Sequence, residues 1–341
     1  MKKRPYERRR LRGIVNTACW LTFGCIVVGL FVALSSSARA ASDGGEPGRP
    51  SSMNAMQVAC VQFENTADIA ENARRMIAIL ETESAAGTRL VVFPECSLST
   101  YGSQIVRALT AEQINAALKT VQEACGRIGI YAVVGSAYIE NGKRYNGAFV
   151  FGPDGRLVKR YAKMHVVKPE LFEEGDALAV FRVDDVPCTI MICHDERYPE
   201  IFRIPVLAGA KIGIYISCES KTREKWDNYR CQVIGRAVEN QISVIHCNSG
   251  DGGADEGSHG HSRIIAPSGN VLAEASTEVG QVIRATIHPK ESSSGHAERG
   301  AAKPSLHAFW QEGLRVLRRQ NPEFFEAAPA QPAADPSARS E

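Results

Sequence analysis

The sequence predicts an α/β protein built in layers of sheet and helix. Short apolar runs rich in β-branched residues, such as residues 187–192 and 212–217, have the length and composition of buried strands. Longer segments between such runs carry apolar residues at helical spacing, and no segment repeats along the chain. Alternating strands and helices are typical of sheets whose faces are covered by helices.

Composition narrows the class of protein further. The 341 residues suffice for one large domain or two ordinary ones, and 44% hydrophobic residues is ordinary for a globular chain. Residues 1–40 carry eight basic residues and one acid, a net of +7, whereas the whole chain carries +2. The rest of the chain is therefore mildly acidic, at about −5, which argues against nucleic acid as a partner.

The two ends of the chain differ from its body. A basic stretch, a mostly apolar run over residues 14–34 and the small-residue pattern Ala38-Arg39-Ala40 predict a signal for export to an extracytoplasmic compartment such as the periplasm, cleaved after Ala40. The alternative is an uncleaved membrane anchor, because the apolar run is long enough to span a bilayer. The predicted organisation is a signal over residues 1–40, a flexible linker over 41–55, the main domain over 56–290, an extension with an amphipathic helix over 291–326, and a disordered tail over 327–341.

The ten cysteines would favour disulfides in an exported chain. Several of them nevertheless lie in apolar, strand-like runs: Cys60, Cys188, Cys193, Cys218 and Cys247. That distribution is typical of a buried core, and we expect no disulfide framework.

Turn and capping signals delimit the elements of the body in order. Strands are predicted over residues 56–62, 89–95, 130–139, 145–151, 156–163, 187–193, 212–217, 243–247, 263–266, 270–274 and 281–287. Helices are predicted from Thr66 to Gly87 and over residues 110–129, 200–208, 219–240 and 304–319. Thr110 and Gln113 form a capping box, and Asn141-Gly142 is a hairpin turn.

Three polar residues stand at the ends of predicted strands. Glu95, Lys163 and Cys193 each follow an apolar strand, and reacting groups of open α/β sheets gather beyond the carboxyl ends of strands. A thiol nucleophile, a carboxylate base and a cation for a developing oxyanion form a consistent catalytic set. The alternatives are a cysteine that only fills the core, a glutamate in a surface ion pair, and a solvated lysine like the nearby Lys168.

Six motifs in order make the chain resemble the carbon–nitrogen hydrolase (nitrilase) superfamily over roughly residues 56–288. They are Phe93-Pro94-Glu95, the lysine motif over residues 161–165, the cysteine motif over residues 193–200, and residues 235–240, 248–250 and 261–269. The resemblance implies a four-layer αββα sandwich and a triad of Glu95 as base, Lys163 as oxyanion stabiliser and Cys193 as nucleophile. It also implies no cofactor and a homodimer or higher homo-oligomer, for which the 304–319 helix is a candidate contact.

The roles of neighbouring residues are less closely defined. The resemblance implies a second glutamate after the lysine, and Glu170 is preferred to Glu174 by its spacing from Gly175. Three residues that follow the nucleophile, His194, Asp195 and Arg197, are expected either to support the turn or to contact substrate.

The predicted function is hydrolysis of a small amide or N-carbamoyl compound through a thioester on Cys193. Acyl transfer to an acceptor other than water is the alternative within the superfamily, and a non-catalytic binding module is the alternative outside it. A metal site is disfavoured, because His246, Cys247, His259 and His261 do not fall into zinc-binding spacings. The glycine-rich segment 248–260 is expected to be either a lid over the site or a surface turn.

Overall fold

The computed structural model describes residues 52–254 and 257–326. The predicted signal or anchor, most of the linker and the predicted tail lie outside these described residues. Within the described ranges, no helix combines the length and the apolar character needed to cross a bilayer.

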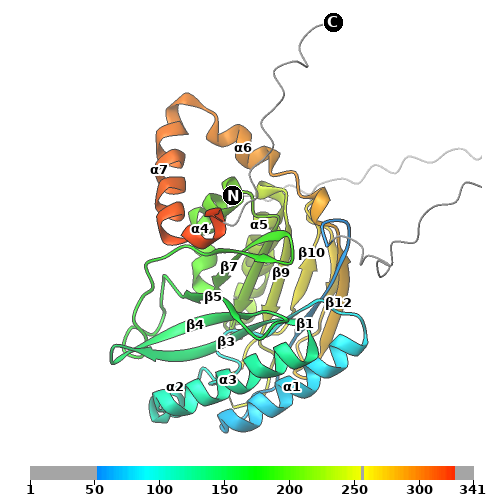
Figure 1. Cartoon of the computed structure of the whole chain (residues 1–341), viewed down its shortest axis with the longest axis vertical. Coiled ribbons are helices and arrows are strands. Elements are labelled where there is room, and N and C mark those ends of the chain that lie inside the picture. Colours follow the sequence, from blue (N-terminus) through cyan, green and yellow to red (C-terminus); the bar gives the residue numbers. More distant parts are fainter. Residues whose placement is uncertain (1–51, 255–256, 327–341) are drawn as a thin grey trace, which may run out of the picture. The chain divides into compact units, whose positions relative to one another are not determined.

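Two six-stranded sheets form the centre of the fold (Figure 1). The first has the strand order β12-β1-β2-β3-β4-β5 and the second β11-β10-β9-β8-β7-β6. The first sheet contains β1 (Met56–Val61), β2 (Leu90–Val92), β3 (Tyr131–Glu140), β4 (Lys143–Phe151), β5 (Leu157–Ala162) and β12 (Val282–Ile287). The second contains β6 (Val180–Val183), β7 (Val186–Ile192), β8 (Ile212–Ser217), β9 (Ser243–Asn248), β10 (Arg263–Ile265) and β11 (Val271–Glu274).

Helices cover the outer face of each sheet. On the first lie α1 (Ile69–Ala85), α2 (Ser103–Ala108) and α3 (Ala111–Ile128); on the second lie α4 (Pro199–Leu207), α5 (Trp226–Asn240), α6 (Gly295–Ala301), α7 (Pro304–Gln320) and α8 (Pro322–Glu326) (Figure 1). Three separate apolar clusters fill the spaces between these layers, one under each helical layer and one between the sheets. The predicted four-layer αββα sandwich is confirmed.

The cluster between the sheets is closely packed. Val58 of the first sheet and Ile190, Ile214 and Ile245 of the second are fully buried there. Burying one such side chain contributes about 1.5–3 kcal/mol. The two sheets therefore form a rigid platform for the residues that follow the ends of their strands.

The strand directions bring the predicted site residues to one edge of this platform. In the first sheet β2 and β3 are parallel, and β5 runs in the same direction because two antiparallel pairings separate it from β3. In the second sheet β7, β8 and β9 are all parallel. The residues that follow β2 and β5 therefore share one edge of the first sheet, and those that follow β7 and β8 share one edge of the second.

Most predicted elements are present, and the differences have local causes. The capping box of Thr110 and Gln113 and the closing Gly129 are confirmed in α3. The first helix begins later than predicted, because Asp68 rather than Thr66 accepts the hydrogen bonds of its first backbone N–H groups. The predicted 219–240 helix is regular only from residue 226, so Glu219 lies in a loop instead of a helix.

The C-terminal amphipathic helix is confirmed as α7, but it buries less than expected. Leu317 packs into the cluster under the second sheet and Trp310 lies partly buried against it. Leu306 and Phe309 remain 46% and 55% exposed. A contact of α7 with a second copy of the chain therefore stays a prediction.

Candidate active site

Cys193 occupies a tight turn directly after β7. Its φ of +46° lies in the left-handed region, which typically costs a non-glycine residue about 1–3 kcal/mol. The fully buried carboxylate of Asp195 supports this turn from below, accepting hydrogen bonds from the Ile192 N–H (3.2 Å), the His165 N–H (2.9 Å) and the Tyr161 hydroxyl (2.8 Å). Asp195 is therefore a support of the turn, one of the two roles expected from the sequence.

Glu95 and Lys163 form a buried ion pair beside this turn. The Lys163 Nζ lies 2.7 Å from Glu95 Oε1, and both side chains are at most 1% exposed. Asn146 Nδ2 donates to the same oxygen at 2.7 Å, while the Cys218 backbone N–H donates to Glu95 Oε2 at 2.8 Å. Among the described residues, Oε1 thus has two hydrogen-bond donors and Oε2 has one.

A glycine on β3 allows the chain to place Glu95. A Cβ added to Gly135 would lie 2.0 Å from the Pro94 carbonyl oxygen and 2.8 Å from the Glu95 Cα. Only glycine tolerates so close a backbone approach. The position of Glu95 is therefore fixed by its main chain as well as by its hydrogen bonds.

Burial, together with the negative charge of Glu95, keeps the Cys193 thiol protonated at rest. Burial raises the pKa of Cys193 well above its usual value, and the carboxylate of Glu95 adds to the increase, while Lys163 opposes it. Burial alone would lower the pKa of Lys163, but Cys193 and Glu95 outweigh that effect and raise it. A neutral thiol next to a charged lysine needs a base before it can act as a nucleophile.

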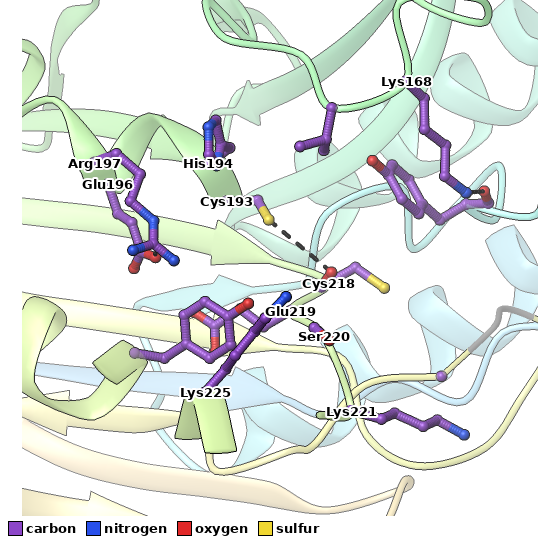
Figure 2. A pocket seen from close by; sticks show the side chains of 14 residues that line it. Lys168, Cys193, His194, Glu196, Arg197, Cys218, Glu219, Ser220, Lys221 and Lys225 are labelled. Carbon is purple, nitrogen blue, oxygen red and sulfur yellow. Dashed lines mark hydrogen bonds and ion pairs between the residues drawn. The ribbon is translucent and has the colours of Figure 1, made fainter. Parts of the chain in front are cut away.

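Cys193 opens into a cavity of about 510 Å³ (Figure 2). Its wall combines basic side chains with two acids: Lys168, Arg197, Lys221 and Lys225, and Glu196 and Glu219. Gly257 belongs to the segment 248–260, expected from the sequence to be either a lid or a surface turn, and it lines the same wall. Lys221 pairs with Asp251 of that segment at 2.6 Å. Movement of this segment stays a prediction.

The two acids belong to a buried cluster that we call the acid hub, made of Glu196, Tyr215, Glu219, His246 and His259. The Tyr215 hydroxyl lies 2.8 Å from Glu196 Oε2 and 2.7 Å from Glu219 Oε1. His246 Nε2 approaches Glu219 Oε1 at 3.3 Å, and His259 Nε2 approaches Glu219 Oε2 at 2.5 Å. One hydroxyl proton cannot serve two carboxylates, so one carboxyl group of the hub is protonated.

The protonated member of the hub is Glu196. Burial raises the pKa of Glu196 to about 8, and the neighbouring Glu219 adds to this effect. Burial alone would raise the pKa of Glu219 as well, but His246 and His259 outweigh it and lower that pKa below its usual range. At neutral pH Glu219 carries the hub's negative charge, and Glu196 is a neutral acid.

We expect Glu196 to make the stability of the protein depend on pH. Its pKa of about 8 in the folded chain exceeds the ordinary 4.5, so between these pH values the folded chain holds a proton that the unfolded chain has released. The free energy of unfolding should then fall by about 1.4 kcal/mol per pH unit as the pH rises from about 5 to 8, relative to Glu196→Gln. Denaturant titrations of both proteins across this range test it, because the histidines contribute equally to both. Parallel curves would show that Glu196 does not hold this proton.

Glu170, the preferred second glutamate, does not line the cavity, and neither does Glu174, so the predicted position of this residue is wrong. Leu171 and Phe172 turn inward and are buried, and Phe172 stacks against Tyr101 with ring centroids 6.2 Å apart. The side chains of Glu170 and Glu174 consequently point to solvent. Spacing from a glycine could not distinguish these alternatives, because it does not reveal which residues of the segment turn toward the core.

His194 and Arg197 do line the cavity. Burial lowers the pKa of His194, and the positive charges of Lys163 and Arg197 lower it further, so the imidazole is neutral. Arg197 approaches Glu196 at 3.6 Å and lies over the Tyr229 ring. It thus faces the cavity and also pairs with the acid hub.

The histidines considered for a metal site have other partners. His246 and His259 both contact Glu219, and His261 Nδ1 lies 3.6 Å from Glu274. In the part of the chain that the structure describes, no group of three histidine, cysteine, aspartate or glutamate side chains is arranged to hold a metal ion.

Several residues of the site were not found by sequence reasoning. They are Asn146, Glu196, Cys218 and Glu219. Glu219 lies two positions beyond the end of β8, the same pattern that identified Glu95, Lys163 and Cys193. Its assignment to a predicted helix hid that signal.

Comparison with known proteins agrees with this fold. The profile of the carbon-nitrogen hydrolase family matches residues 57–295. The chain is 31% identical over 243 residues to the 2-oxoglutaramate amidase of Bacillus subtilis (strain 168), which covers 69% of this chain and 92% of that protein. It is 28% identical over 241 residues to the omega-amidase NIT2 of Homo sapiens, and the match covers 66% of this chain and 86% of that protein.

Solved structures share the same fold. Nit3 of Saccharomyces cerevisiae, a member of the nitrilase superfamily, has a TM-score of 0.66 at 24% identity, over 74% of this chain and 97% of that one. An amidase of Nesterenkonia sp. AN1, solved as a cysteine-to-alanine mutant with butyramide, has a TM-score of 0.65 at 21% identity, over 75% and 97%. The chain therefore belongs to the carbon-nitrogen hydrolase family and is an amidase-type hydrolase.

Proposed function

We propose that the protein hydrolyses a small amide through a thioester on Cys193, with Glu95 and Lys163 as its partners. The observation that carries this proposal is the buried Glu95–Lys163 pair next to a neutral thiol that opens into the cavity. A carboxylate and an ammonium group held this tightly are a base and an oxyanion partner already in position.

The reaction follows from these positions. The Cys193 sulfur attacks the amide carbon while its proton passes to Glu95. The oxyanion that forms is stabilised by Lys163 and by the backbone N–H that follows Cys193. The C–N bond then breaks, the amine leaves with the proton from Glu95, and a thioester remains. Water, deprotonated by Glu95, attacks the thioester and releases the acid and the thiol.

The cavity wall suggests that the amide carries a carboxylate at its other end. Lys168, Arg197 and Lys225 line the wall, whereas Glu196 is neutral and the side chain of Glu219 is fully buried in the acid hub. Lys168 could not be distinguished from other solvated lysines by its sequence position, but it lines the cavity and lies over the Tyr101 ring. The names of the 2-oxoglutaramate amidase and omega-amidase relatives point to the same kind of substrate.

A pair of substrates tests this selectivity. A short ω-amide with a free carboxylate should have a higher kcat/KM than the amide whose carboxylate is replaced by a methyl ester. Lys168→Met should lower kcat/KM for the charged amide about tenfold, the loss of one charged hydrogen bond, and leave the ester unchanged. Lys143→Met, which removes an exposed lysine of β4 paired with Glu173, is the matched control. Equal losses on both substrates would refute the carboxylate assignment.

The thioester itself is tested by mass measurement. Brief exposure to substrate should produce an acyl adduct on the peptide that contains Cys193. Adding amine acceptors then separates hydrolysis from acyl transfer, because an acyltransferase would form the new amide in preference to the free acid. Turnover without any Cys193 adduct, even at short reaction times, would argue against covalent catalysis.

A further inference from the structure

The proposed reaction uses Glu95, Lys163 and Cys193, and it assigns no role to the acid hub. Glu219 borders the cavity, but it is ionised and its side chain is 0% exposed. Removing a charge from water costs several kcal/mol unless hydrogen bonds compensate for it. Tyr215 and His259 form hydrogen bonds with this one carboxylate, and His246 Nε2 lies 3.3 Å from it. We therefore asked what the buried carboxylate of Glu219 does for the nearby nucleophile Cys193.

The backbone next to Glu219 touches both members of the reacting pair. The Cys218 N–H donates to Glu95 Oε2 at 2.8 Å, and the Cys218 carbonyl oxygen lies 4.0 Å from the Cys193 sulfur (Figure 2). Among the described residues, Oε2 has one hydrogen-bond donor and Oε1 has two, so Oε2 is the oxygen better placed to accept the proton of Cys193. The Cys218 backbone therefore contacts both the proposed proton acceptor and the sulfur of the nucleophile.

Cys218 directly follows β8, which holds it on its N-terminal side. On its C-terminal side it is held by Glu219. Glu219 does this with its main chain as well as its side chain. The Glu219 N–H donates to Asn248 Oδ1 at 3.0 Å, and its carbonyl oxygen accepts from Ser258 Oγ at 2.7 Å. With the side chain bound to His259, every polar group of Glu219 is held by the second sheet or by the loop that follows it.

We propose that Glu219 is a positioning residue for the amidase reaction, which holds the Cys218 peptide against Glu95 and Cys193 so that the proton can pass between them. This inference rests on the proposed roles of Glu95 and Cys193. It assigns the acid hub to alignment of the proton acceptor, and it requires no contact between the hub carboxylates and the substrate.

The charge of Glu219 alone would have the opposite effect on the thiol. A nearby negative charge raises the pKa of Cys193, and Glu219 contributes to that increase. If Glu219 acted only through its charge, Glu219→Gln would make Cys193 more acidic and more reactive. If Glu219 acts by positioning, the same variant leaves Glu95 misaligned and makes Cys193 less reactive.

The experiment compares wild type, Glu219→Gln and a control with a similarly buried acid far from the cavity. Glu83 is 1% exposed and is bound by Thr88 and Arg284, so Glu83→Gln also removes a buried charge. Two quantities are measured: the kcat and KM for a short ω-amide, and the rate at which iodoacetamide alkylates Cys193 between about pH 6 and 9, followed by peptide mass. The second quantity needs no substrate of the enzyme.

Glu219→Gln is expected to lower kcat about 10²-fold with KM nearly unchanged, because small misplacements of catalytic groups have effects of that size. Cys193 alkylation should slow by about tenfold or more across the same pH range. Glu83→Gln should lower the melting temperature and leave both quantities within about twofold of wild type. Faster alkylation in Glu219→Gln, or an unchanged kcat, would overturn the proposal.

A second variant covers the case in which Glu219→Gln does not fold. Tyr215→Phe removes only the hydroxyl that joins the two acids of the hub and keeps the buried ring. It should lower kcat and slow alkylation in the same direction, and unchanged values would overturn the proposal. If the wild type turned over no amide at all, the proposed function would fail, while the alkylation rates would still decide whether Glu219 controls the thiol.

Discussion

Cys193→Ala is expected to abolish amide turnover in a protein that remains folded, because it removes the proposed nucleophile next to the Glu95–Lys163 pair. Cys193→Ser should be nearly as inactive, since a hydroxyl has a much higher pKa than a thiol and Glu95 is too weak a base to activate it. Glu95→Gln removes the proton acceptor, and Lys163→Met removes the charge that faces the oxyanion. Each of the last two should lower kcat by about 10²–10³-fold, equivalent to about 3–4 kcal/mol.

These losses should not add. A thiol without its base and a base without its thiol fail at the same step, so Cys193→Ala combined with Glu95→Gln should be no worse than Cys193→Ala alone. The measurements are turnover of a short ω-amide and intact-protein mass after brief exposure to it. Lys143→Met serves as the control, because its lysine lies on an exposed pair, whereas Lys168 lines the cavity. Near-normal turnover by a folded Cys193→Ala protein would exclude the thioester mechanism.

The fold was predictable wherever the determining interactions are local. The capping box at Thr110 and Gln113 spans four residues, and the Asn141-Gly142 turn needs only the positive φ angles that both residues adopt. Apolar strand runs followed by Glu95, Lys163 or Cys193 identified three groups that the sheets bring to one edge, because parallel strands end together. The layered sandwich itself came from family resemblance, since nothing in the periodicity distinguishes one sheet from two.

The remainder of the site depends on contacts between distant parts of the chain. Asn146 lies within a strand and holds Glu95, which precedes it by 51 residues. Glu219 depends on His259, which follows it by 40 residues. Neither partner leaves a local pattern in the sequence. The preference for Glu170 rested on its spacing from Gly175, which does not reveal that Leu171 and Phe172 are buried while Glu170 is exposed.

Substitutions in the Glu95–Lys163 pair should also change the stability of the fold, and the single variants should lose more stability than the double variant. Both side chains are at most 1% exposed, so removal of either partner leaves the other charge buried and unpaired. Lys163→Met leaves the Glu95 carboxylate with Asn146 and the Cys218 N–H but without a counter-charge. Breaking a buried pair in this way typically costs about 3–5 kcal/mol. Glu95→Gln should cost a similar amount, because Lys163 then has to remain charged in the same apolar surroundings or lose its proton.

The double variant Glu95→Gln with Lys163→Met should be more stable than either single variant, since it leaves no unpaired charge at the site. The melting temperature should fall by about 10 °C in each single variant, at about 2–4 °C per kcal/mol, and recover substantially in the double. Cys193→Ala is the control, because it removes a group that is neutral at rest and should leave the melting temperature close to that of wild type. Measurements at pH 7 by calorimetry and by denaturant titration would complete the cycle. Additive losses in the double variant would mean that the two groups stabilise the fold independently, and the pair would then be no more than two polar residues that happen to touch.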